Sequence, residues 1–234
     1  MFRAAALLAF WGVAALPVAL VGFTWTLITG NPEFLYRLGT GVGLLGVRLV
    51  GVKVEVMGLD RLDPHRTYVF MCNHVSNLDP PVAIPVIPRR TSVLVKKELF
   101  RVPVLGQAMR IAGLVAVDRR NREAAVTSVR AAAEVVRSGL DMVVFPEGTR
   151  SRDGRLLPFK KGPFYLAMES GAPIVPMTIV GTHELWPKGK FGLRPGTATV
   201  IFHEPIETST YTDQETLMNT VRERIRSGLP AKYQ

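Results

Sequence analysis

The chain has 234 residues, enough for one domain with its own hydrophobic core and a smaller appended segment. A single cysteine, Cys72, excludes an intramolecular disulfide, and the four histidines show no paired metal-ligand spacing, so we expect neither a metal nor a cofactor. The net charge of +10 favours an anionic partner, and because no nucleic-acid-binding module accompanies it, we expect an anionic lipid surface rather than nucleic acid.

Residues 1–50 form a hydrophobic segment that we expect to associate with a membrane. A helix over Ala4–Ile28 would be about 38 Å long, against about 30 Å for the hydrocarbon core of a bilayer. Thr29–Pro32 predicts a turn, and the apolar pattern resumes over Phe34–Val50. A secretory signal and a single spanning helix are the alternatives; we favour a helical hairpin embedded in one leaflet or crossing shallowly.

Residues 51–234 alternate predicted strands with predicted helices. The strands are expected at Val52–Met57, Thr67–Cys72, Ser92–Val95, Leu114–Val117, Met142–Phe145, Ile174–Val180 and Ala198–Phe202. Helices are expected from Pro80, from Pro103 to Ala112, over Arg122–Ser138 and Pro163–Ser170, and from Thr212, which has capping-box spacing to Glu215. This alternation predicts an α/β domain, with a mixed sheet covered by helices on both faces and preceded by the hydrophobic hairpin.

A histidine and a carboxylate stand where the second predicted strand ends. Asn73–Asp79 follows this strand, and Asp79 is expected to cap a helix that begins at Pro80. A regular helix would place His74 and Asp79 roughly 140° apart, so a turn is needed to bring the two side chains together. Asp79 would then accept a hydrogen bond from one ring nitrogen and leave the other as a free base.

A second polar motif, Phe145–Ser151, also begins where a short apolar strand ends. With Asn73–Asp79 (NHVSNLD), this motif (FPEGTRS) resembles the glycerolipid acyltransferase family, and specifically its 1-acyl-sn-glycerol-3-phosphate acyltransferases. Gly113–Arg119, Ile174–Thr178 and Lys96–Phe100 resemble further blocks of the family in the same order. Ala116 departs from the pattern, since the family usually has a bulkier residue there, which leaves the acceptor less certain than the reaction.

The resemblance implies transfer of a fatty acyl group from acyl-CoA or acyl-carrier protein to the sn-2 hydroxyl of lysophosphatidic acid, forming phosphatidic acid. His74 would be the general base and Asp79 would orient it, with the substrate hydroxyl standing where a hydrolase has its serine. The chain has no G-x-S-x-G motif, and neither Ser76 nor Cys72 is expected to carry the acyl group.

The resemblance also implies that Glu147, Gly148, Thr149 and Arg150 bind the acceptor. The Arg150 guanidinium would hold the phosphate, because its geometry matches a phosphoryl group. Glu147 would bond the glycerol hydroxyl, hold Arg150, or hold a backbone amide. The remaining candidates for phosphate binding are basic residues for which a solvated face is the alternative: Arg119, Lys160 and Lys161.

Other functions fit parts of the same pattern. Another acceptor, such as glycerol-3-phosphate, a lyso-ornithine lipid or a different lysophospholipid, would use the same chemistry. Water at His74 would instead give a thioesterase, and a membrane-binding protein without enzymatic activity is the alternative outside catalysis. For the acyltransferase we expect a membrane location, with the catalytic domain on the cytoplasmic face.

Overall fold

Seven strands form one sheet in the computed structural model, which describes residues 2–118 and 122–234. The strands are β1 (Val52–Met57), β2 (Val69–Cys72), β3 (Thr91–Lys96), β4 (Val115–Val117), β5 (Asp141–Val144), β6 (Ile174–Val180) and β7 (Gly196–Phe202). Their order in the sheet is β1-β7-β6-β2-β5-β3-β4, and every neighbouring pair is parallel except β6 and β7. The predicted mixed sheet is confirmed, with strand ends shifted by at most two residues.

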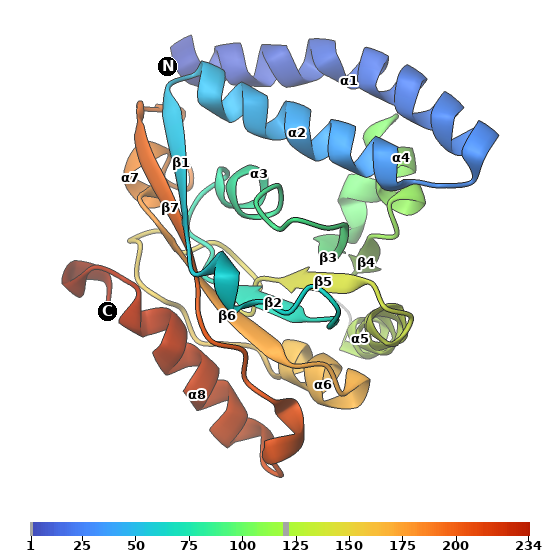
Figure 1. Ribbon diagram of the computed structural model, residues 1–234. Helices are drawn as coiled ribbons and strands as arrows, with labels where there is room; N and C mark the ends of the chain where they lie inside the picture. Colours follow the sequence, from blue (N-terminus) through green and yellow to red (C-terminus); the bar gives the residue numbers. More distant parts are fainter. Residues whose placement is uncertain (1, 119–121) are drawn as a thin grey trace.

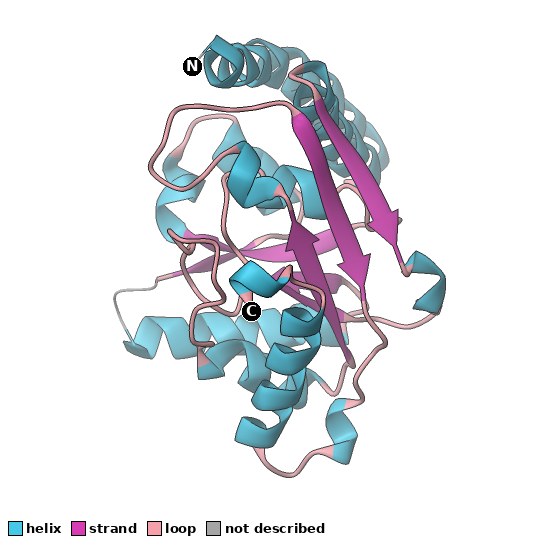
Figure 2. Cartoon of the chain, turned by 90° about the vertical axis from the view of Figure 1, so that its left-hand side faces the viewer, coloured by secondary structure: helices cyan, strands magenta, loops and turns pink. Residues whose placement is uncertain are grey.

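The central strand β2 is buried on both faces. Such a strand reads as a continuous apolar run, because neither side of it meets water. Phe70 and Cys72 point into the core on one face, whereas Val69 and Met71 point into the core on the other. The sheet is therefore sandwiched between two helical layers, as predicted (Figure 2).

An N-terminal hairpin and a short helix cover one face of the sheet. Helices α1 (Phe2–Thr29) and α2 (Glu33–Leu49) lie side by side along the top of Figure 1, above α3 (Asp79–Ala83). Residues from the inner side of the hairpin belong to the same buried cluster as Phe70 and Cys72: Ala4, Leu7, Val47 and Val50. The hairpin is thus packed onto the α/β part of the chain.

The two helices of the hairpin approach each other closely. A Cβ atom at Gly46 would lie 2.6 Å from Trp11 Nε1 and 2.8 Å from Phe10 Cδ1, so any larger residue would force these side chains to move. Arg3 Nη1 donates to Val50 O at 2.7 Å and ties the start of α1 to the end of α2. Helix α1 is continuous through Pro17.

The outer face of α1 is apolar. Its large exposed side chains are Phe2, Leu8, Val13, Leu16, Leu20, Val21, Trp25, Leu27 and Ile28. Among the residues that the structure describes, α1 is the one helix that is long and apolar enough to cross a membrane.

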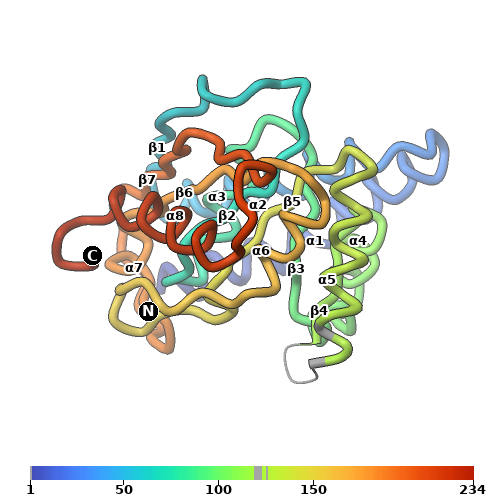
Figure 3. Tube along the Cα trace, turned by 90° about the horizontal axis from the view of Figure 1, so that it is seen from below, coloured from blue at the N-terminus to red at the C-terminus, as the bar shows by residue number. Residues whose placement is uncertain are grey.

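Three helices cover the opposite face of the sheet. Figure 3 looks onto this face and shows α5 (Arg122–Arg137), α6 (Lys161–Ser170) and α8 (Gln214–Ser227) across it. Apolar residues of these helices form a second core with Val69 and Met71. The capping box predicted from Thr212 is wrong, because the side chain of Asp213 accepts from the backbone N–H of Thr216 at 2.7 Å.

The segment between β3 and β4 also differs from the prediction. Helix α4 (Leu105–Ile111) begins two residues later than expected, after a short 3₁₀ turn over Lys97–Arg101. Val104 has φ 65° and ψ −56°, and Leu105 N donates to Pro103 O at 2.7 Å, so a γ-turn precedes the helix. A short helix, α7 (Thr182–Leu185), follows β6 after a single residue, Gly181.

Candidate active site

The ends of three adjacent parallel strands bring the site together. Strand β2 lies between β5 and β6, and all three run in the same direction. Their carboxyl ends therefore meet at one edge of the sheet, where open α/β sheets bind their ligands. His74 follows β2, Glu147 follows β5 and Thr182 follows β6.

His74 and Asp79 are in direct contact. His74 Nδ1 lies 2.7 Å from Asp79 Oδ2, so the predicted turn does bring the carboxylate back to the imidazole. Asp79 is fully buried, and its other donors are Val75 N and Ser76 N, each 2.7 Å from Oδ2, and Thr182 Oγ1, 2.6 Å from Oδ1. Four hydrogen bonds fix this carboxylate.

The prediction that Asp79 caps a helix is wrong. Helix α3 begins at Asp79 itself, with Leu78 in the capping position. Pro80 and Pro81 have no backbone N–H to offer a cap. The carboxylate instead turns back to the amides of the preceding turn, which directs it to His74.

The environment of Asp79 selects one tautomer of His74. An oxygen that already accepts from two backbone amides acts as an acceptor, so we assign the shared proton to Nδ1 of His74. The other ring nitrogen, Nε2, then keeps its lone pair. The imidazole also stacks on Phe145, with ring centroids 4.2 Å apart and an interplanar angle of 29°, which restricts its rotation.

Glu147 joins the second motif to the first. Its side chain is buried, and Oε1 accepts from His74 N at 2.6 Å while Oε2 accepts from Leu157 N at 2.8 Å. Ser151 N donates to His74 O at 2.8 Å, so both backbone groups of His74 are held by the second motif. Of the roles predicted for Glu147, these contacts support the one in which it holds a backbone amide.

Burial raises the pKa of Glu147 from 4.5 to about 7, although the two backbone N–H groups oppose the shift. Desolvation disfavours the ionised form of a carboxyl group, whereas hydrogen bonds from N–H groups favour it. The group therefore changes its protonation state near neutral pH.

The rest of the second motif, Gly148–Arg150, is more exposed to solvent than Glu147. Gly148 has φ 69°, a conformation that favours glycine. Arg150 Nη1 donates to Asn77 Oδ1, which places the guanidinium beside the first motif. Lys160 lies near Gly148, since a side chain added at Gly148 would meet Lys160 Cγ at 3.5 Å.

Two further basic residues, Lys161 and Arg119, were predicted to bind phosphate. Lys161 is exposed at the start of α6, and its backbone carbonyl accepts from Gln214 Nε2 at 3.1 Å. Arg119 lies outside the described residues. No group of three His, Cys, Asp or Glu side chains that could hold a metal ion occurs within residues 2–118 and 122–234.

Neither alternative nucleophile is placed to react. Ser76 is fully buried, and its hydroxyl donates to Trp186 O at 2.7 Å. Cys72 is also fully buried, and burial raises the pKa of its thiol well above the ordinary value. A thiol in such surroundings stays protonated and unreactive.

Several residues at the site were not predicted from the sequence. Thr182 contacts Asp79, Asn77 contacts Arg150, and Lys188 contacts the backbone of Arg150. The available signal for Thr182 was its position directly after a predicted strand, the same position that singled out His74. Lys188 lies in an irregular segment and had no such signal.

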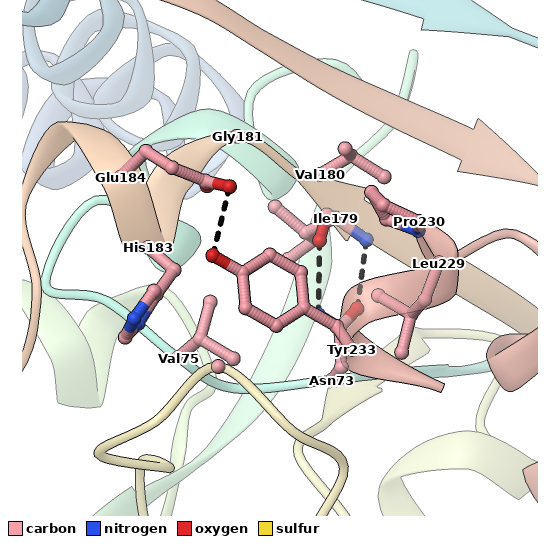
Figure 4. Close-up of a pocket in the computed structure, with 11 residues that line it drawn as sticks. Asn73, Val75, Ile179, Val180, Gly181, His183, Glu184, Leu229, Pro230 and Tyr233 are labelled. Carbon is pink, nitrogen blue, oxygen red and sulfur yellow. Dashed lines mark hydrogen bonds between the residues drawn. The ribbon is translucent and has the colours of Figure 1, made fainter.

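Asn73 holds the first motif against β6. Its side-chain Nδ2 donates to Ile179 O at 2.9 Å, and its Oδ1 accepts from Ile179 N at 2.7 Å (Figure 4). A small pocket beside this pair is also lined by Val75, His183 and Tyr233. Both polar atoms of the Asn73 side chain are thus used in bracing the turn.

Comparison with known proteins identifies the family of this chain. Residues 53–180, more than half of the chain, match the family model described as Acyltransferase. The chain therefore belongs to the acyltransferase family, and the resemblance seen in its sequence motifs is confirmed.

The similar proteins are named for one activity. The 1-acyl-sn-glycerol-3-phosphate acyltransferase of Limnanthes douglasii is 38% identical over 196 residues, which cover 82% of this chain and 69% of that protein. The protein of the same name from Cocos nucifera is 40% identical over 199 residues, covering 85% of this chain and 63% of that protein. The crystal structure of the 1-acyl-sn-glycerophosphate (LPA) acyltransferase PlsC from Thermotoga maritima is similar with a TM-score of 0.79 and 27% identity, covering 95% of this chain and 92% of that chain.

The raised pKa of Glu147 predicts how its contribution to stability changes with pH. Between pH 4.5 and 7 the folded protein holds a proton at Glu147 that the unfolded chain has released, so stability falls as pH rises. The difference in pKa corresponds to roughly 3 kcal/mol of unfolding free energy at most. Because glutamine does not titrate, the stability of the wild type relative to Glu147→Gln should decrease from pH 4.5 to 7.5, measured by denaturant unfolding. A wild-type stability that stays constant or rises with pH, relative to that of Glu147→Gln, would contradict this.

The contact between Thr182 and Asp79 predicts a second effect. Thr182→Val keeps the shape of the side chain but leaves a buried carboxylate oxygen without its donor. The unfolding free energy should fall by about 1–3 kcal/mol. Acyl transfer should fall roughly tenfold to a hundredfold, because the imidazole is then held less firmly. Thr182→Ser retains the hydroxyl and is the control; equal activity of the two variants would show that the hydroxyl does not matter.

Proposed function

We propose that the protein transfers a fatty acyl group from an acyl thioester, acyl-CoA or acyl-carrier protein, to the sn-2 hydroxyl of lysophosphatidic acid, forming phosphatidic acid. The names of its relatives support this acceptor. The observation that supports the chemistry best is the contact of 2.7 Å between His74 Nδ1 and the buried Asp79 carboxylate, which leaves Nε2 as a base.

His74 moves one proton during the reaction. Its Nε2 removes the proton of the acceptor hydroxyl as that oxygen attacks the carbonyl carbon of the thioester. The tetrahedral oxyanion that forms then collapses, the C–S bond breaks, and the imidazolium returns the proton to the leaving thiolate. An ester and a free thiol result, and His74 is again neutral.

Asp79 stabilises the positive charge that appears on His74 midway. The carboxylate is held by Val75 N, Ser76 N and Thr182 Oγ1, so it does not need to reorganise when the imidazolium forms. This is the relationship of the histidine and aspartate in a hydrolase triad, with the acceptor hydroxyl in place of the serine.

The second motif binds the acceptor on the solvent-exposed side of the His74–Asp79 pair. Arg150 is held beside the first motif by Asn77, and its guanidinium can bind two phosphate oxygens at once. Gly148 allows the backbone to approach the acceptor closely, Thr149 offers a hydroxyl, and Lys160 adds positive charge nearby. Glu147 contributes indirectly, through the backbone of His74.

The hairpin seats the enzyme on a membrane, where both the acceptor and the product reside. Its outer face is apolar over the length of α1, and the net charge of +10 favours an anionic leaflet. Such a leaflet lies on the cytoplasmic side of a cell membrane, and we place the catalytic domain there.

Replacing His74 tests the reaction. In His74→Ala the rate of acyl transfer from labelled acyl-CoA to lysophosphatidic acid should fall by about 10²–10⁴-fold, because the base is lost. His65→Ala is the matched control, since this histidine is exposed and lies outside both motifs. Activity of His74→Ala equal to that of the control would remove His74 from the mechanism.

An acceptor panel in the same assay tests the substrate. Lysophosphatidic acid, glycerol-3-phosphate, a lyso-ornithine lipid and other lysophospholipids are each offered, and the acylated products are identified by mass. We expect phosphatidic acid to be the main product. Free fatty acid as the main product in the presence of lysophosphatidic acid would indicate a thioesterase instead.

Charges on the outer face of α1 test the membrane seat. Leu16 is 66% exposed and Leu20 71% exposed, so glutamates there should leave the fold intact. Leu16→Glu with Leu20→Glu should weaken binding to vesicles that contain phosphatidylglycerol by at least about tenfold in a flotation assay. Val126→Glu adds one glutamate at an exposed position on α5 and should bind like the wild type. Equal binding of all three proteins would exclude this face of α1 from the contact.

A further inference from the structure

The segment after α7 runs beside the first motif. Pro187 forms an isolated antiparallel bridge with Ser76, and the Ser76 hydroxyl donates to Trp186 O at 2.7 Å. The next residue, Lys188, is therefore placed next to the turn that holds His74, although more than 100 residues separate them in the chain.

The ammonium group of Lys188 is held by the second motif. Its Nζ donates to Arg150 O at 2.6 Å and lies 3.2 Å from Thr149 Oγ1. An ammonium group has three N–H donors, and these contacts use two of them. One N–H therefore remains for a ligand.

Three cations, Lys188, Arg150 and Arg152, lie close enough to influence one another electrostatically. Burial lowers the pKa of Lys188, and the positive charges of Arg150 and Arg152 lower it further. None of the three forms an ion pair with an acidic side chain of residues 2–118 and 122–234, whereas Lys97 is paired with Asp118 and Lys232 with Glu184. Like charges held close together repel each other, and an anionic ligand would relieve this repulsion.

We infer that Lys188 is a second cation of the acceptor subsite, which binds the second negative charge of a phosphomonoester. The inference rests on the proposed function and deepens it. A phosphomonoester carries a charge of about −1.5 to −2 at pH 7. Arg150 can bind two of its oxygens as a planar fork, and Lys188 would bind the third as a compact charge.

This arrangement assigns a specificity to Lys188. A phosphodiester headgroup has only one negative charge, which Arg150 alone can balance. Lys188 would therefore favour lysophosphatidic acid over lysophospholipids whose phosphate carries a further headgroup.

The test compares Lys188→Gln with wild type in full-length protein on mixed vesicles. The KM for lysophosphatidic acid should rise by about 10-fold to 100-fold, the effect of losing one hydrogen bond to a charged group. The kcat and the KM for acyl-CoA should change by less than about threefold. Lys188→Arg restores the charge and should recover most of the affinity, and Lys190→Gln, in the same segment, should behave as wild type.

A diester separates recognition from a merely structural role. Lysophosphatidylglycerol is added as a competitor, and its inhibition of Lys188→Gln should stay close to that of wild type. If Lys188 only positions the backbone of Arg150, the diester and lysophosphatidic acid will weaken together, which would overturn the inference. An unchanged KM for lysophosphatidic acid in Lys188→Gln would also overturn it. Failure of the wild type to acylate lysophosphatidic acid would instead refute the proposed function.

Discussion

The Asp79 carboxylate is buried at the meeting point of three elements, and the site depends on how it is satisfied. It accepts hydrogen bonds from the turn after β2, from the imidazole of His74 and from Thr182 after β6. A buried carboxylate with fewer donors would be costly. The same bonds that make its burial tolerable also fix the position and the tautomer of His74, so folding and catalytic geometry have a common origin.

Glu147 acts in the same way on the backbone. Where Asp79 fixes the imidazole, Glu147 binds the N–H of His74, and Ser151 N binds its carbonyl. The loops after β2 and β5 therefore support each other, and this is possible because the two strands are parallel neighbours. The Glu147 carboxyl is a poor ligand for an acceptor in this arrangement, since it is buried and already binds two backbone amides.

The sequence predicted well the features that depend on short stretches of the chain. His74, Asp79 and Arg150 stand in short motifs at strand ends, and their proximity follows from two apolar runs lying parallel in one sheet. Thr182 and Lys188 could not be assigned, because their contacts depend on β6 lying beside β2, and hydrophobic periodicity says nothing about the order of strands. Details of hydrogen bonding were also missed. Pro80 and Pro81 deny Asp79 the role of a cap, and Asp213 takes the capping role expected of Thr212.

The packing of the hairpin onto the sheet has a consequence for how the chain can be divided. Ala4, Leu7, Val47 and Val50 fill the same core as Phe70 and Cys72, and Cys72 lies two residues before His74. Removing residues 1–50 would thus expose the apolar core side chains next to the turn that carries His74. A shortened, water-soluble version would need polar substitutions on that surface, because the hairpin is part of the hydrophobic core as well as the membrane-facing segment.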